Sequence, residues 1–204
     1  MEELYINNEG ISFLIYSNFE LTNLISTLVT QYNQAAYSLE MYWLVKEKIN
    51  EPEYYYLFQY SIPFYYAENY FIKLDMCVKI VSEMKKYTNK KKNIKLFFKR
   101  INKIFPNLRY VRNSIAHFED RIQNKGPNNQ KAINDDTNVI IGNIIDGKYQ
   151  TEIYVEKPIE YKTNHKKKVI YEKKRITIDL AKIKLLEFKK LLLNLLIDLA
   201  KKEP

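Results

Sequence analysis

The chain has 204 residues, 46% of them hydrophobic, which suits one folded domain with or without an insertion. Its formal net charge is +9, and its single cysteine, Cys77, excludes an internal disulfide. A lone thiol in an apolar helical pattern is typical of a buried residue in a reducing cytosol. No signal-peptide pattern and no segment of membrane-spanning length is found, so we expect a cytoplasmic protein without membrane association.

The charges are unevenly distributed along the chain. Residues 1–60 contain eight acids and two lysines and so carry a net charge of −6, whereas the segment from Lys85 to Arg112 contains eleven Lys or Arg and no acid. Such segregation favours a phosphate-bearing partner such as RNA. On charge alone, a solvated lysine-rich surface explains the pattern equally well.

Apolar residues at spacings of three and four predict four helices in the first part of the chain. Pro52 ends the first helix, Pro63 can begin the second at its first turn, and Pro106 separates the last two. The expected ranges are 19–49, 63–84, 94–105 and 108–122.

A β-hairpin is predicted after these helices. The β-branched residues 139–145 are followed by Asp146-Gly147, which is a strong hairpin signal, and 149–155 form the expected return strand. Two further β-branched stretches, 169–171 and 175–178, are expected to supply a third strand.

The last predicted helix covers 180–202, and Asp179 is its candidate cap. This helix is apolar on most of its circumference, which indicates burial between other helices or at a subunit interface. The fold class is therefore mainly α, an antiparallel helical bundle with a β-hairpin insertion before the last helix. The expected organisation is one domain, 1–204, with the bundle at about 19–122 and 179–202 and the insertion at about 123–178.

The side chains best suited to chemistry lie in the fourth helix, in the stretch Arg112-Asn113-Ser114-Ile115-Ala116-His117. Arg neutralises phosphate charge and His transfers protons near neutral pH, so the pair suits phosphodiester cleavage without a metal. At about 100° per residue, Asn113 and His117 lie opposite the core stripe and Arg112 lies on its flank. An exposed polar face with local ion pairs remains the alternative interpretation.

The pattern Arg112-Asn113-xxx-His117 resembles the signature of the HEPN superfamily, in which an Arg, often followed by Asn, Asp or His, is separated from a His by four to six residues. The resemblance extends over the helical bundle. It implies a metal-independent endoribonuclease of a toxin–antitoxin or phage-defence system. His117 would then be the general acid or base, Arg112 would stabilise the phosphorane-like transition state, and Asn113 would orient Arg112, His117 or a phosphate oxygen. The implied products are a 2′,3′-cyclic phosphate and a 5′-OH.

Arg112 and His117 point in directions about 140° apart on a helix, so one copy positions them poorly on one phosphate. Two copies across a twofold axis can bring both pairs together. The family resemblance likewise implies dimers, and we therefore expect a homodimer with a composite active site.

Further basic residues are expected to guide RNA through phosphate contacts. They are Lys90, Lys91, Lys92, Lys95, Lys99, Arg100 and Arg109. No metal-binding pattern or glycine-rich phosphate loop is found, so no metal or cofactor is predicted. An antitoxin or another regulatory protein is a further candidate partner. Two alternatives stay open: a HEPN-fold module that binds RNA, a nucleotide or a protein without turnover, and a helical interaction protein with a coincidental motif.

Overall fold

The computed structural model describes residues 3–7, 19–48, 62–116, 143–158 and 169–200. The chain forms two compact units, one made of residues 1–108 and 179–204 and the other of residues 109–178. The predicted mainly helical fold, with a small antiparallel sheet before the last helix, is confirmed. The single-domain organisation stays a prediction.

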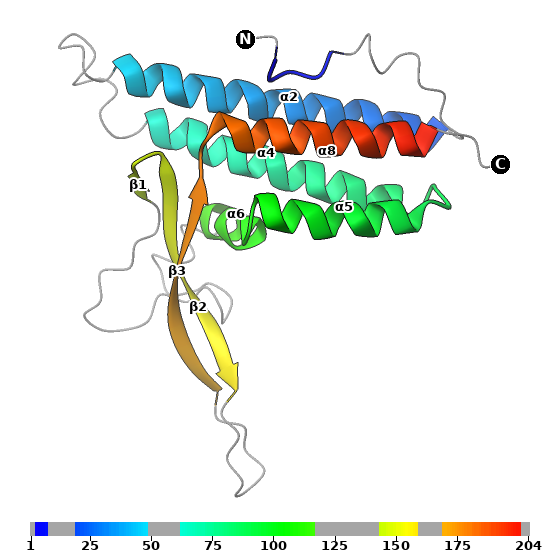
Figure 1. Ribbon diagram of the computed structural model, residues 1–204. Coiled ribbons are helices and arrows are strands. Elements are labelled where there is room, and N and C mark those ends of the chain that lie inside the picture. Colours follow the sequence, from blue (N-terminus) through cyan, green and yellow to red (C-terminus); the bar gives the residue numbers. More distant parts are fainter. Residues whose placement is uncertain (1–2, 8–18, 49–61, 117–142, 159–168, 201–204) are drawn as a thin grey trace, which may run out of the picture. The chain divides into compact units, whose positions relative to one another are not determined.

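Four helices of the first unit form a bundle (Figure 1). They are α2 (Phe19–Lys48), α4 (Ile62–Met84), α5 (Lys91–Ile104) and α8 (Lys182–Ala200). Asn69 Nδ2 donates to Ser38 Oγ over 2.6 Å, and the buried Cys77 Sγ lies 3.9 Å from the Leu28 carbonyl oxygen. The residue numbers rise along α4 as they fall along α2. These two helices are therefore antiparallel, as the sequence predicted for the helices of the bundle.

Phe188 of α8 lies at the centre of the core and is fully buried. Its ring centroid is 5.8 Å from that of Tyr32 in α2 and 6.0 Å from that of Phe97 in α5. Phe105, directly after α5, lies 6.1 Å away in an edge-to-face arrangement. One aromatic side chain thus holds three segments together.

Helix α8 is held at both ends by side chains that are distant in sequence. Trp43 Nε1 donates to the Leu180 carbonyl over 2.9 Å, just before the helix begins. Lys90 Nζ donates to the Asp198 carbonyl over 2.7 Å. A cation at this position stabilises the last turn of the helix, where carbonyl groups lack partners within the helix. The helix begins two residues later than predicted, and the Asp179 carboxylate accepts the Ala181 N–H over 2.9 Å at this point.

The second unit contains most of α6 (Leu108–Ala116) and a three-stranded antiparallel sheet in the order β1-β2-β3. The strands are β1 (Asn143–Ile145), β2 (Lys148–Pro158) and β3 (Val169–Asp179). Ile144 pairs with Tyr149 across a two-residue turn in which Asp146 has φ 50° and Gly147 has φ 70°. Two successive positive φ angles give the type I′ turn that the Asp-Gly pair favours. The predicted hairpin and third strand are therefore confirmed.

Parts of some predicted elements lie outside the described residues. They are 49, 117–122, 139–142 and 201–202, and they include His117. Within the residues that are described, no helix is long and apolar enough to cross a membrane.

Candidate functional site

Helix α6 carries the first half of the Arg–His motif. The chain enters this helix through Pro106 and Asn107, and Asn107 has a left-handed φ of 68°. Leu108 and Val111 of the predicted apolar stripe are buried, at 7% and 0% exposure, whereas Ile115 of the same stripe is half-buried. Arg112 is only half-buried, so its guanidinium stays within reach of solvent.

A hydrogen bond joins the two motif side chains that the structure describes. Arg112 Nη1 donates to Asn113 Oδ1 over 2.9 Å. Because the donor is charged, this bond is stronger than a neutral one and restricts the orientation of the guanidinium. A guanidinium carries five N–H donors in a fixed plane, and the bond to Asn113 uses one of them. The orienting role of Asn113 in catalysis stays a prediction.

His117 follows the last described residue of α6, and its role as general acid or base stays a prediction. The roles of Arg112 and Asn113 in catalysis are predictions in the same sense. What the structure adds is their mutual contact and the helical backbone that carries both.

Basic side chains form a continuous strip on the outer face of α5. Ile94, Phe97 and Ile101 are buried on one side of this helix. The opposite side carries four exposed lysines at spacings of three, four and four, which we call the lysine strip: Lys92, Lys95, Lys99 and Lys103. Over eleven residues the strip extends about 16 Å along the helix axis. Such a row of cations can contact successive phosphates of one RNA strand.

Lys103 was not among the residues that we predicted to contact RNA. The signal was present in the sequence, since Lys103 follows Lys99 by four residues and therefore lies on the same helical face. The predicted set contained the other three lysines of the strip, Lys92, Lys95 and Lys99, and omitted this one. The face of the helix, and not the local density of charge, defines the strip.

The other predicted RNA-binding residues lie in different settings. Lys91 is exposed at the start of α5, and Arg109 is exposed on α6 in the second unit. Lys90 binds the last turn of α8 as described above, so it has a structural role. Arg100 lies on the flank of α5 that faces α8, away from the lysine strip.

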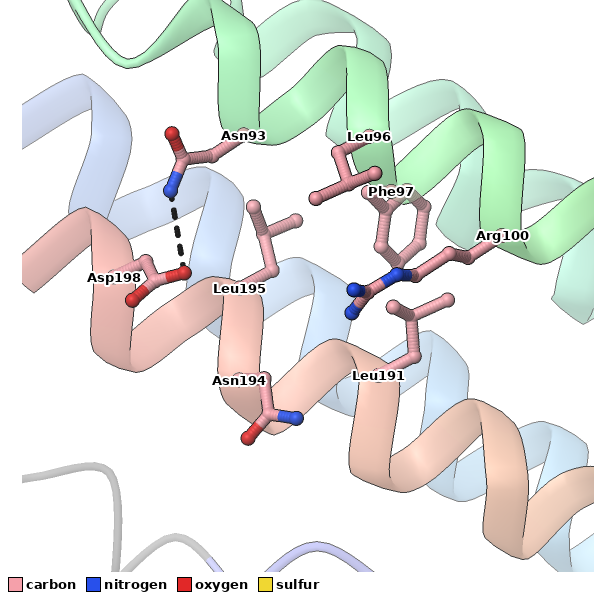
Figure 2. A pocket seen from close by; sticks show the side chains of 8 residues that line it. All are labelled: Asn93, Leu96, Phe97, Arg100, Leu191, Asn194, Leu195 and Asp198. Carbon is pink, nitrogen blue, oxygen red and sulfur yellow. Dashed lines mark hydrogen bonds between the residues drawn. The ribbon is translucent and has the colours of Figure 1, made fainter.

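A small hollow lies between α5 and α8 (Figure 2). Its eight lining residues are Asn93, Leu96, Phe97, Arg100, Leu191, Asn194, Leu195 and Asp198. Asn93 Nδ2 donates to the Asp198 carboxylate over 3.2 Å at one end, and the Arg100 side chain reaches from α5 toward α8 at the other (Figure 2). The volume of about 40 Å³ has room for only a few water molecules, so the hollow is too small for a nucleotide.

No cluster of three or more His, Cys, Asp or Glu side chains that could hold a metal ion occurs in the described part of the chain. Comparisons with protein-family models, with curated proteins and with solved structures found no significant match to this chain. Two separate features are therefore candidates for function on the chemistry of their own residues: the Arg112–Asn113 pair on α6 of the second unit, and the lysine strip on α5 of the first.

Proposed function

We propose that this protein is a metal-independent endoribonuclease of HEPN type. The observation that carries the proposal is the Arg112–Asn113 hydrogen bond, in a motif that ends at His117, four residues after Asn113. A held guanidinium stabilises the negative charge that develops on phosphorus when a ribose 2′-OH attacks. His117 would take the 2′-OH proton or protonate the leaving 5′ oxygen.

The lysine strip supports RNA as the substrate. Its four ammonium groups are exposed, lie on one helical face, and belong to a segment that contains no acid between Lys85 and Arg112. Contacts of this kind bind the sugar–phosphate backbone without reading base sequence. The sequence specificity of cleavage would then have to come from other contacts.

The proposed active unit is a homodimer, because Arg112 and His117 diverge by about 140° on an α-helix. In a composite site, Arg112 of one copy and His117 of the other would act on the same phosphate. A toxin or defence effector with an inhibitory protein partner fits this activity.

Cleavage of end-labelled single-stranded RNA tests the proposal. Arg112→Ala and His117→Ala should each lower the rate at least about 100-fold, because each removes a group that acts in the transition state. EDTA should have no effect, and the products should carry 2′,3′-cyclic phosphates. Arg175→Ala is the matched control, since it removes an exposed guanidinium from a strand of the same unit. Equal losses in all three variants would refute the assigned roles.

Subunit mixing tests the composite site. Arg112→Ala and His117→Ala chains, each inactive alone, should recover part of the activity when they are unfolded together and refolded as mixed dimers. A mixed dimer keeps one intact pair in which the two residues come from different copies. Verified mixed dimers without activity would contradict the shared site.

A second candidate function is RNA binding without turnover, which the lysine strip favours by itself. Under this alternative, RNA is retained and never cleaved, and Arg112→Ala weakens binding only modestly. Cleavage assays on the wild-type chain over several hours separate the two functions.

A further inference from the structure

Residues 3–7 form a short irregular segment that contacts both α2 and α8. Leu4 and Ile6 are buried, at 6% and 3% exposure, whereas Glu3 and Asn7 are exposed. The segment lies along α2 in Figure 1, where it is dark blue. Its two apolar side chains, two residues apart, are therefore embedded while the residues around them remain at the surface.

The docking site recognises this segment mainly through the main chain. The Ile6 N–H donates to Asn33 Oδ1 over 2.8 Å, and Asn33 Nδ2 donates to the Ile6 carbonyl over 3.0 Å. One side-chain amide thus pairs with both polar groups of a single residue. The Tyr32 hydroxyl lies 2.9 Å from the Leu4 carbonyl oxygen, and Lys189 Nζ donates to the Glu3 carbonyl over 2.7 Å.

A side chain of the segment is also recognised at this docking site. The Tyr5 hydroxyl donates to the Glu40 carboxylate of α2. Main-chain pairing accepts many sequences, whereas two aliphatic side chains and a donor between them define a preferred ligand. The recognition chemistry is therefore that of a peptide-binding site.

The covalent connection does not by itself hold the segment in place. Eleven residues, 8–18, join it to Phe19 at the start of α2, and they can span up to about 40 Å. Asn33 lies fourteen residues into α2 from Phe19, which is about 21 Å along the helix axis. The length of this connection therefore sets no requirement that the helices change when the segment leaves its site.

The docking site can persist when the segment has left. The Tyr32 hydroxyl also lies 3.3 Å from the Leu185 carbonyl oxygen of α8, so it keeps an acceptor. Its ring stays packed against Phe188 in the core. Asn33 and Glu40 are half-buried, so water can satisfy their polar groups.

We propose that Tyr32, Asn33, Glu40 and Lys189 form a peptide-binding site that residues 3–7 occupy as an intramolecular ligand. The site accepts in their place a peptide of a partner protein that has aliphatic residues two positions apart and a hydrogen-bond donor between them. Residues 3–7 then compete with this partner and set the concentration at which it binds. The inference is independent of RNA cleavage.

Fluorescence anisotropy with a labelled peptide of residues 1–8 tests the proposal on the full chain. Leu4→Ser/Ile6→Ser should empty the site and raise peptide affinity at least tenfold over the wild type. Adding Asn33→Ala to that variant should abolish binding, and a peptide with serine at both aliphatic positions should bind neither chain. Equal affinity of the peptide for all three chains, with circular dichroism showing intact helices, would overturn the proposal.

Hydrogen exchange on the wild-type chain provides a test that needs no variant. Exchange of the Ile6 amide should be at least 100-fold faster than that of the Leu28 amide in the core of α2, because the segment opens without unfolding the bundle. Equal protection of both amides would overturn the proposal. A concentration-dependent dimer that Leu4→Ser/Ile6→Ser abolishes would show a second copy as the occupant, and would overturn the partner assignment.

Discussion

The lysine strip on α5 makes a quantitative prediction about RNA binding. Lys95 and Lys99 lie in the middle of the strip, one helical turn apart, and both are exposed. Replacing both with Gln removes two charges and keeps side chains that are compatible with a helix. Binding is measured in the His117→Ala background, so that the RNA is not cleaved.

The expected size of the effect follows from the number of phosphate contacts. For single strands, the slope of log K against log salt is about −0.7 for each phosphate that is neutralised. Four strip lysines give a slope of about −2.8, and the double variant should give about −1.4. Between about 50 and 200 mM salt, the affinity should therefore fall about 50-fold for the parent chain and about 7-fold for the variant.

The assay is fluorescence anisotropy with a labelled single-stranded RNA at four or more salt concentrations. Lys182→Gln/Lys190→Gln is the matched control, since it removes the same charge from exposed positions on α8. This control should leave the slope unchanged. The reasoning is refuted if the strip variant keeps the parent slope, or if the control flattens it equally, because net charge and not the strip would then bind RNA.

Three other substitutions test packing, burial and the motif. Phe188→Ala removes the centre of the aromatic core and should lower the free energy of unfolding by about 3–5 kcal/mol in urea titrations. The control is Ile183→Ala, at a position 58% exposed on the same helix, which should change this free energy by less than about 0.5 kcal/mol. The Tyr70 hydroxyl is buried without a hydrogen-bond partner among the described residues, so Tyr70→Phe should raise the unfolding free energy at pH 7 by about 1–3 kcal/mol; a loss of stability would contradict this. Burial also raises the pKa of the Tyr70 phenol well above its usual 10.0. Above pH 10 the unfolded chain ionises this phenol while the folded chain keeps it neutral, so the wild type loses stability as the pH rises. Between pH 10 and 11, Tyr70→Phe should therefore lose up to about 1.4 kcal/mol less stability than the wild type. Asn113→Ala should slow RNA cleavage about tenfold, which is a smaller loss of rate than we expect for Arg112→Ala. The guanidinium is then still present but has lost the hydrogen bond that orients it. A cleavage rate equal to that of the wild type would show that Asn113 has no role in the mechanism.

Local patterns in the sequence were sufficient to predict most of the secondary structure. The apolar spacings predicted α2 and α4 nearly to their ends, and Pro106-Asn107 marked the break before α6. Asp146-Gly147 predicted a hairpin that the structure confirms with two positive φ angles. These features act over a few residues through backbone sterics and helical periodicity, so they can be recognised without knowledge of the rest of the chain.

The candidate functional residues also include some that local sequence could identify and one whose contact depends on the fold. Arg112 and Asn113 are neighbours on one helix, so sequence reasoning could identify them as a pair, and their hydrogen bond is a local contact. Sequence reasoning treated Lys90 as another phosphate ligand. Only the fold brings the ammonium group of Lys90 to the last turn of α8, 108 residues away.

The tertiary structure alone decided which distant side chains meet. Trp43 binds the carbonyl of Leu180, and Asn33 binds both main-chain groups of Ile6, although nothing in the local sequence of either pair indicates a partner. A side chain with a polar group can satisfy it in many ways, and burial of the apolar faces determines which acceptor is within reach. Periodicity and turn chemistry therefore specify the helices and the hairpin, whereas the packing of the helices creates the surface on which residues 3–7 dock.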